Sequence, residues 1–254
     1  MTVSAKSKIR LDQLLVDQDH FASRSRARDA ISRGCVAVDG TLVEKPGANV
    51  TPSQQIEIHD NAQAYVSRAA LKLIAGLEAS GYSPEGRTCL DVGASTGGFT
   101  QVLLERGAIH VLALDVGHGQ LAEPLQNDPR VTNLEKINAR TLTRNHLGGG
   151  RPDFIVSDVS FISLKLALPP ALELAEPESA AVLLVKPQFE VGRQAIGKQG
   201  LVSDDAAQNC AEDLRNWLRE QPGWRSTHLV PSPIKGGDGN QEYLLCGLKD
   251  GTQV

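Results

Sequence analysis

The first sixty residues alternate short apolar runs with turn signals, a pattern typical of a small α+β domain. Three leucines within residues 11–15 recur at helical spacing and predict a short amphipathic helix. A second helix is predicted to begin near Ser23 or Ser25, since either side chain can cap a helix N-terminus. An apolar run at residues 35–38 and alternating apolar positions at residues 55–58 then predict two strands.

The rest of the chain alternates buried strand patterns with helical ones. Helices are predicted over residues 99–104 and 204–219, from their periodic apolar positions. This alternation predicts an α/β fold, with a mostly parallel sheet covered by helices on both faces. The predicted strands cover residues 88–92, 109–115, 131–134, 153–158, 180–186, 224–230 and 242–248.

Composition adds a question about charge. The chain has 254 residues, 41% of them apolar, and a formal net charge of -4, so there is no overall basic character. Positive charge is concentrated in residues 24–33, where four arginines stand against the single acid Asp29. Arginines on a short helix can make bidentate contacts to phosphates. The same charges also fit a solvated helix face without a ligand.

Cysteine and histidine usage argues against metal and disulfide chemistry. The four cysteines lie far apart without a Cys-x-x-Cys pair, and the six histidines lack ligand spacing. We therefore expect reduced, mostly buried thiols and no metal. The first six residues lack the apolar stretch of a secretory signal. The longest apolar run, residues 180–185, is far shorter than the roughly 20 residues that span a bilayer. A cytoplasmic protein that does not bind membranes is expected.

A glycine-rich turn follows the first strand of the α/β segment. Residues 93–98 read Gly-Ala-Ser-Thr-Gly-Gly and connect that strand to the helix opened by Phe99. Strand, glycine turn and helix in this order let backbone N–H groups approach a ligand closely. Asp115 ends the next strand, 22 residues after Gly93. That spacing matches the roughly 20 residues at which an acid meets ribose hydroxyls in nucleotide-binding folds.

Polar residues stand at the ends of several predicted strands. Asp91, Asp115, Asp158 and Lys186 all occupy such positions. In a mostly parallel sheet the carboxyl ends of the strands meet at one edge, where ligands bind. We therefore expect the ligand site at this edge.

The glycine turn resembles the first motif of class I methyltransferases. Asp91-Val-Gly-Ala-Ser-Thr-Gly-Gly-Phe99 differs from the pyrophosphate-binding Gly-x-Gly-x-x-Gly pattern. The resemblance implies S-adenosylmethionine as the cofactor, with the glycines making room for its amino-acid and sulfonium end. It also implies that Asp115 holds the ribose and that Asn138 lies near the adenine. The implied cofactor-binding residues are Asp91, Gly93, Ala94, Ser95, Thr96, Gly97, Gly98, Phe99, Asp115, Val116, Asn138 and Asp158.

The N-terminal segment resembles the RNA-binding domain named after ribosomal protein S-four. The motifs are Arg10-Leu-Asp-x-Leu-Leu, Ser23-Arg-Ser-Arg-Ala and Gly34-x-Val-x-Val-Asp-Gly. The resemblance implies that this domain docks on structured RNA through its shape and backbone. We expect an RNA-binding domain over residues 1–60, a linker over 61–68 and a catalytic domain over 69–254. The candidate RNA contacts are Arg10, Arg24, Arg26, Arg28, Arg33, Arg68 and Lys198.

Four further motifs carry a closer resemblance. They are Tyr65-Val-Ser-Arg-Ala-Ala-Leu-Lys, Ser157-Asp-Val-Ser-Phe-Ile-Ser, Leu184-Val-Lys-Pro-Gln-Phe-Glu and Gly239-Asn-Gln-Glu. Over nearly the whole chain they resemble the TlyA, or haemolysin A, family of ribosomal RNA methyltransferases. The catalytic half resembles the FtsJ-type ribose 2′-O-methyltransferases, which have a Rossmann-like fold. The family's Lys-Asp-Lys-Glu tetrad maps onto Lys72, Asp158, Lys186 and Glu242. The resemblance implies that the enzyme methylates the ribose of a cytidine in the RNA of ribosomal subunits.

The tetrad makes chemical sense for this reaction. A ribose hydroxyl is a poor nucleophile, so a base must remove its proton during attack. A lysine can be that base only if burial or a neighbouring cation lowers its proton affinity. Lys72 and Lys186 in one pocket would do this to each other, with Asp158 and Glu242 orienting them. We expect Lys186 to be the base and Lys72 to position the hydroxyl or stabilise the oxyanion, without any metal.

Two other functions compete with this hypothesis. One is a catalytically inactive RNA-binding factor in ribosome assembly, against which the complete tetrad and glycine turn argue. The other is a haemolysin, which no membrane-spanning segment or basic amphipathic helix supports. Residues 192–200 and 236–239 are rich in glycine and are expected to be mobile loops that become ordered around the substrate.

Overall fold

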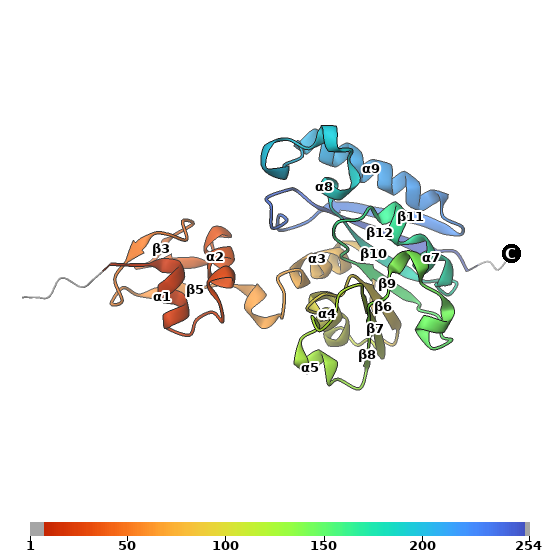
Figure 1. The fold of residues 1–254 in the computed structure, drawn as a ribbon, viewed down its shortest axis with the longest axis horizontal. Coiled ribbons are helices and arrows are strands. Elements are labelled where there is room, and N and C mark those ends of the chain that lie inside the picture. Colours follow the sequence, from red (N-terminus) through yellow and green to blue (C-terminus); the bar gives the residue numbers. More distant parts are fainter. Residues whose placement is uncertain (1–7, 252–254) are drawn as a thin grey trace, which may run out of the picture. The chain divides into compact units, whose positions relative to one another are not determined.

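The structure is a computed structural model and describes residues 8–251 (Figure 1). The first six residues, which lack a signal-like pattern, lie outside that range. Contacts divide the chain into two units, Met1–Gln63 and Ala64–Val254. The stretch predicted as a linker begins with the 3-10 helix η1 (Asn61–Ala64). After it, the N–H of Val66 donates to Oε1 of Gln101 at 2.9 Å, so this part of the stretch is bonded to the second unit.

The first unit combines two helices with short antiparallel strands. Strand β2 lies between β3 and β5 in a three-stranded sheet, and β1 pairs with β4. The hydroxyl oxygen of Ser23 accepts from the N–H of Arg26 and caps the second helix. Both predicted helices are present. Strands β1, β3 and β4 have only two residues each, and no periodic pattern in the sequence predicts them. The elements are β1 (Ile9–Arg10), α1 (Leu11–Asp17), α2 (Arg24–Ser32), β2 (Val36–Val38), β3 (Thr41–Leu42), β4 (Asn49–Val50) and β5 (Ile56–Ile58).

The second unit is built on a seven-stranded sheet of order β11-β12-β10-β9-β6-β7-β8. The five strands from β10 to β8 are parallel to one another, and β12 is antiparallel to both β10 and β11. The mostly parallel sheet predicted from the sequence is therefore confirmed. The strands are β6 (Thr88–Val92), β7 (His110–Asp115), β8 (Val131–Glu135), β9 (Phe154–Ser157), β10 (Ala180–Val185), β11 (Trp224–Pro231) and β12 (Tyr243–Lys249).

Helices cover both faces of this sheet (Figure 1). The two longest are α3 and α9, and several helices are single turns that the sequence patterns do not predict. The α-helices are α3 (Ala70–Ser80), α4 (Gly98–Glu105), α5 (Glu123–Gln126), α6 (Leu164–Ala167), α7 (Pro169–Leu174), α8 (Pro187–Glu190) and α9 (Asp204–Glu220). The 3-10 helices are η2 (Ala139–Thr141), η3 (Arg144–Leu147), η4 (Arg193–Ala195) and η5 (Lys198–Gly200).

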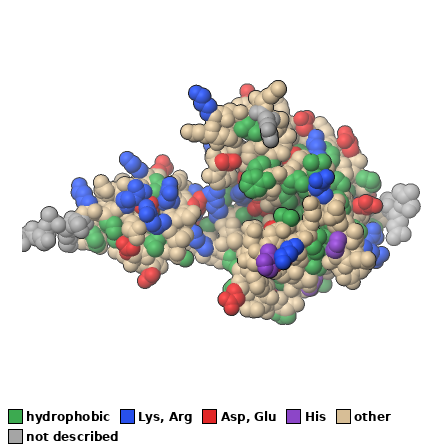
Figure 2. Space-filling view, viewed as in Figure 1, with side chains coloured by type: hydrophobic (Ala, Val, Ile, Leu, Met, Phe, Trp, Pro, Cys, Tyr) green, Lys and Arg blue, Asp and Glu red, His purple; other side chains and the backbone are tan. Residues whose placement is uncertain are grey.

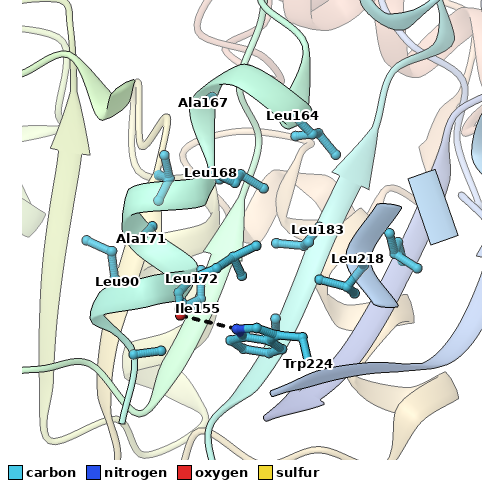
Figure 3. Close-up of a cluster of buried hydrophobic side chains, with 14 of the residues drawn as sticks. Leu90, Ile155, Leu164, Ala167, Leu168, Ala171, Leu172, Leu183, Leu218 and Trp224 are labelled. Atoms are coloured by element: carbon cyan, nitrogen blue, oxygen red, sulfur yellow. Dashed lines mark hydrogen bonds between the residues drawn. The ribbon is translucent and has the colours of Figure 1, made fainter. Parts of the chain in front are cut away.

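Side chains of each strand alternate between two hydrophobic cores, one on each face of the sheet. Leu183 of β10 packs with α6, α7 and α9, whereas its neighbours Val182 and Leu184 pack with α3 and α4. Figure 3 shows the first of these cores, in which Trp224 Nε1 donates to the backbone oxygen of Leu172 at 3.1 Å. Burial on both faces fixes the sheet, and with it the strand ends where ligands are expected.

Helix α3 lies unusually close to the sheet. A Cβ atom on Gly76 would stand only 2.6 Å from Val182 Cγ1, closer than such atoms approach. Glycine is therefore required here by the close approach of the helix to β10 and β12. Lys72 lies one turn before Gly76, on the same face of the helix. The seating of the helix thus sets how far Lys72 reaches over the sheet.

Across residues 8–251, none of the helices combines the length and apolar character needed to cross a bilayer. Cys89, Cys210 and Cys246 are buried and Cys35 is half-buried, all as free thiols. Burial raises the pKa of the Cys246 thiol to about 11, so this thiol is protonated at neutral pH.

Candidate active site

The turn between β6 and α4 packs tightly against the end of β9. Gly93 has φ of +88°, and a Cβ there would lie 3.0 Å from both the Asp158 oxygen and the Val159 nitrogen. Gly97 also has a positive φ, of +96°, and caps α4. Both positions need glycine, because side chains avoid this backbone region and no space is left for one. The turn therefore lies directly beside Asp158.

A cavity of about 450 Å³ opens beside this turn. Six of the residues predicted to bind a cofactor line it: Gly93, Ser95, Asp115, Val116, Asn138 and Asp158. The sequence patterns missed others on its wall, including Gly117, Gln120, Ser160, Phe161 and Ile162. Most of these belong to the segments that follow β7 and β9. Their neighbours Asp115 and Asp158 were the signal that could have identified them.

Asp115 forms hydrogen bonds to two segments of the cavity wall. Its carboxylate accepts from the N–H of Ser95 at 2.8 Å and from the N–H of Gly117 at 2.7 Å. It thereby connects the glycine turn to the loop after its own strand. Asn138 lines the cavity as predicted, while its side-chain oxygen accepts from the N–H of Arg140 at 3.0 Å and caps η2.

Asp91 occupies a different position from the other predicted cofactor residues. It is fully buried and does not line the cavity. Thr100 Oγ1 donates to Asp91 Oδ2 at 2.7 Å, but no hydrogen-bond donor among the described residues reaches Oδ1. Burial raises the pKa of this carboxyl to about 7, against the lowering effect of the Thr100 hydrogen bond. Asp91 therefore supports the glycine turn from within the domain. The buried Gly97 likewise packs on Leu121 and Leu125.

A smaller cavity of about 130 Å³ lies on the other side of the turn. It shares Gly93, Ser95, Asp158 and Ser160 with the larger cavity, so the two adjoin. Its wall also includes four further predicted residues of the turn, together with Ser67, Ala69 and Lys186. These turn residues are Ala94, Thr96, Gly98 and Phe99.

Lys186 faces this smaller cavity from the end of β10. Its Nζ lies 2.7 Å from Asp158 Oδ1 and donates to Ser160 Oγ at 2.7 Å. The lysine and aspartate side chains remain 12% and 17% exposed. The amine therefore has one hydrogen bond, to Ser160, and one ion pair, with Asp158, and is still accessible from the cavity.

Lys72 and Glu242 form a second pair, between α3 and the residue before β12. Nζ of Lys72 donates to Glu242 Oε2 at 2.5 Å, and the side chains are only 7% and 2% exposed. Burial raises the pKa of Glu242, while the charge of Lys72 opposes that rise. Lys186 and Asp158 also act electrostatically on Glu242, so the structure brings the four predicted residues into one cluster. Neither cavity described above is lined by Lys72 or Glu242.

The predicted RNA-contacting arginines of the first unit are partly engaged with its own acids. Arg10 and Arg24 pair with the buried Asp12, and hydrogen bonding by Arg10 lowers the pKa of this carboxyl to about 2. Arg33 pairs with Asp29 and Asp60. Arg26 lies within 3.4 Å of the Ala62 oxygen, and Arg28 is exposed. Lysine and arginine side chains gather on the face of this unit seen in Figure 2.

The two candidate RNA contacts of the second unit lie near glycine-rich loops. The Arg68 guanidinium approaches Gly237, since a Cβ on that glycine would be 3.5 Å from Nη2. Lys198 is exposed in η5.

A further residue that the patterns missed is Phe161, which has φ of +66°, is 90% exposed and lines the larger cavity. Its ring packs against Phe189 with centroids 5.0 Å apart.

Within the part of the chain that the structure describes, no group of three or more His, Cys, Asp or Glu side chains is arranged to hold a metal ion.

A seven-stranded sheet of this order, with a glycine turn and acids at its strand ends, defines the class: the second unit is a Rossmann-like methyltransferase domain. Residues 65–249 match the FtsJ-like methyltransferase family, and residues 9–56 match the S4 domain.

Similarity to individual proteins extends over nearly the whole chain. It is 45% identical to 16S/23S rRNA (cytidine-2′-O)-methyltransferase TlyA of Mycobacterium tuberculosis, over 94% of this chain and 89% of that protein. It is 40% identical to Hemolysin A of Brachyspira hyodysenteriae, over 93% and 98% of the two chains. A solved hemolysin structure from Streptococcus thermophilus shares 37% identity and a TM-score of 0.75, over 97% and 90%. The chain belongs to the TlyA, or hemolysin A, family of FtsJ-like methyltransferases.

Proposed function

We propose that this protein is an S-adenosylmethionine-dependent 2′-O-methyltransferase that modifies the ribose of a cytidine in ribosomal RNA. The observation that carries the proposal is the Lys186 amine, which is held by Asp158 and Ser160 at the junction of two cavities. The activity for which the Mycobacterium tuberculosis relative is named supports the choice of substrate. Such a substrate implies a cytoplasmic enzyme.

The larger cavity fits the proposed cofactor. Its lining contains the carboxylates Asp115 and Asp158 and the apolar side chains of Leu114 and Ile137, whereas no lysine or arginine is among the described residues that line it. Carboxylates suit ribose hydroxyls and a cationic sulfonium or amino group, but they repel phosphates. The cavity therefore favours a positively charged nucleoside over a dinucleotide. Because Gly93 has no side chain, the backbone of the turn can lie directly against that of Asp158.

The reaction needs a proton acceptor beside the sugar hydroxyl. S-adenosylmethionine, when bound, supplies an electrophilic methyl group. Lys186 Nζ takes up the proton of the ribose hydroxyl as the oxygen attacks. Asp158 and Ser160 hold the amine in one orientation, and the Asp158 carboxylate stabilises the ammonium that forms.

The second lysine contributes a fixed charge. Lys72 is buried and paired with Glu242, close enough to the first pair for all four residues to interact electrostatically. A preorganised positive charge favours the negative charge that develops on the sugar oxygen. Glu242 keeps that lysine buried at an acceptable energetic cost.

Two features suit an RNA substrate. The first unit, with its S4 domain, offers an exposed Arg28 and half-exposed Arg10 and Arg24 for phosphates. Phe161 exposes an apolar ring beside the cavity, on which an unstacked base can stack. A nucleotide displaced from its helix would place its sugar near Lys186.

The decisive experiment incubates the full chain with isotope-labelled S-adenosylmethionine and ribosomal subunits from a strain that lacks the modification. Nuclease digestion and mass spectrometry then locate the label. We expect 2′-O-methylcytidine with the wild-type protein, and none with K186A, although that variant still binds the cofactor. Label on a base would refute the proposed mechanism. Binding to subunits without any methyl transfer would instead support the inactive assembly factor.

A further inference from the structure

Asn240 joins two loops that lie far apart in the sequence. It is 2% exposed and belongs to the connection between β11 and β12. Its Oδ1 accepts from the N–H of Val202 at 2.8 Å, and its Nδ2 donates to the backbone oxygen of Gly200 at 3.0 Å. Both functional atoms of one buried amide are therefore committed to the main chain of a single distant segment, residues 197–202.

The loop that carries Asn240 belongs to the catalytic cluster. The N–H of Gly236 donates to the backbone oxygen of Asn240 at 2.9 Å, which closes the loop into a tight turn. A Cβ on Gly236 would lie 2.7 Å from Glu242 Oε1, so the turn packs directly on the buried carboxylate. The next residue, Gly237, lies beside the Arg68 guanidinium.

The segment that Asn240 holds has an unusual backbone. The N–H of Gly197 donates to the Leu201 oxygen at 2.8 Å, and Gln199 and Gly200 both have positive φ, of +64° and +81°. The tip of this turn exposes Lys198, while Val202 at its base is buried. A turn in such a conformation persists only where its surroundings hold it. Asn240 supplies two hydrogen bonds to it, at its base.

We propose that Asn240 is a positioning residue for the RNA substrate: it fixes the Lys198 turn, residues 197–202, beside the loop that packs on Glu242. The inference rests on the proposed function, because it assigns the turn to the substrate side of the methyltransferase site. Truncation of Asn240 leaves the buried Val202 N–H and the Gly200 oxygen without their partner. The turn then samples other conformations, and Lys198 loses its fixed place relative to the catalytic cluster.

Hydrogen exchange of the full-length protein tests the clamp itself. We expect the Val202 amide to exchange about tenfold faster in N240A than in the wild type, since it loses a hydrogen bond of about 1.4 kcal/mol. N240D keeps an acceptor for that amide but loses the donor to Gly200, so we expect a smaller increase. Q241A is the matched control, because the Gln241 amide donates only within its own hairpin, to the oxygens of Ser232 and Glu242. Unchanged exchange in N240A would overturn the proposal.

Binding and kinetics test the role of the turn. We expect N240A to raise both the Kd and the KM for ribosomal subunits about tenfold, while the Kd for S-adenosylmethionine stays at the wild-type value. K198A should raise the subunit Kd without accelerating exchange at Val202. The double variant should be no weaker than N240A alone, because both changes remove one contact.

The outcomes separate the possible failures. Faster exchange in N240A with wild-type Kd and KM for subunits would show a purely structural clamp and overturn the proposal. Additive effects of N240A and K198A would overturn it as well. The exchange and binding measurements need no methyl transfer. A wild-type chain that binds subunits without methylating them would therefore refute the proposed function alone.

Discussion

The two lysine–acid pairs of the second unit contain the same kinds of groups in different surroundings. Lys72 and Glu242 are almost wholly buried and have a single close contact with each other. Lys186 and Asp158 retain more exposure, line a cavity, and include the Ser160 hydroxyl as a further partner. The first pair is packed between a helix and the sheet, whereas the second stands at the end of a strand beside open space.

This difference separates two roles that a sequence motif presents as one. A buried ion pair contributes little net stability when intact, but it destabilises strongly when one partner is removed. An amine at a cavity can instead exchange a proton with a bound substrate. We infer that Lys72–Glu242 is chiefly an electrostatic and architectural pair, and that Lys186–Asp158 carries the proton transfer. Substitutions in and around the two pairs test the contrast.

The largest effect is expected at Lys186. K186A removes the proton acceptor, so kcat should fall by about 10²–10⁴-fold while the thermal midpoint stays near that of the wild type. Methyl transfer to ribosomal subunits and thermal unfolding measure the two quantities. K165A is the matched control, since Lys165 is exposed on α6. A K186A variant that retains more than a tenth of the activity would assign the base elsewhere.

Substitution of Glu242 should lower the stability of the protein strongly, whereas K186A lowers mainly kcat. E242Q leaves Lys72 buried without a counter-charge, which costs about 3–5 kcal/mol of unfolding free energy. D158N, in the more open pair, should cost much less. Replacing both buried partners, in K72M/E242L, should restore stability but not activity. Urea unfolding of the variants checks this order, and equal losses for E242Q and D158N would remove the distinction between the pairs.

A smaller effect is expected at Ser160. S160A deprives the Lys186 amine of one of its two oxygen partners, so we expect kcat to fall about tenfold. S160T keeps a hydroxyl and should recover most of the loss. The KM for S-adenosylmethionine should not change. A change confined to that KM would show that Ser160 acts through the larger cavity, which it also lines, instead of through the amine.

The last effect, on stability and not on activity, concerns Asp91, a buried acid whose pKa burial raises. Its folded-state pKa of about 7 lies above the ordinary value of 3.8, so the folded protein holds this proton more tightly than the unfolded chain does. The stability that this proton contributes is present in full below about pH 4 and is lost as the pH rises toward 7, by up to about 1.4 kcal/mol per pH unit. D91N should remove this slope. Urea unfolding of both proteins at pH 5, 6 and 7 measures it, and parallel curves would contradict the assignment.

Much of the fold followed from local patterns. Strand β6, the glycine turn and α4 form one continuous local signal, and Asp115 stands at a characteristic spacing after them. The same logic placed Asp158 and Lys186 at one edge of the sheet, because parallel strands bring their carboxyl ends together. These positions depend on neighbours in the sequence and on sheet geometry alone.

Other features depend on contacts between distant segments. No local pattern indicates that Lys72 pairs with Glu242, 170 positions away, and Lys186 with Asp158. Ser160 meets Lys186 only because β9 and β10 are adjacent, and its hydroxyl looks ordinary in the sequence. Asn240 likewise gains its partners only when two loops meet. The positive φ of Phe161 is a tertiary outcome too, since nothing in its side chain favours that backbone conformation.

Gly76 has a consequence for how this enzyme can change. The helix that carries Lys72 packs at this glycine directly on the side chains of Val182 and Leu244, without a side chain of its own between them. The height of the lysine above the sheet therefore depends on the sizes of three residues, at positions 76, 182 and 244. A larger residue at any of them would lift the charge, so evolution of the active site is constrained at a contact that touches no substrate.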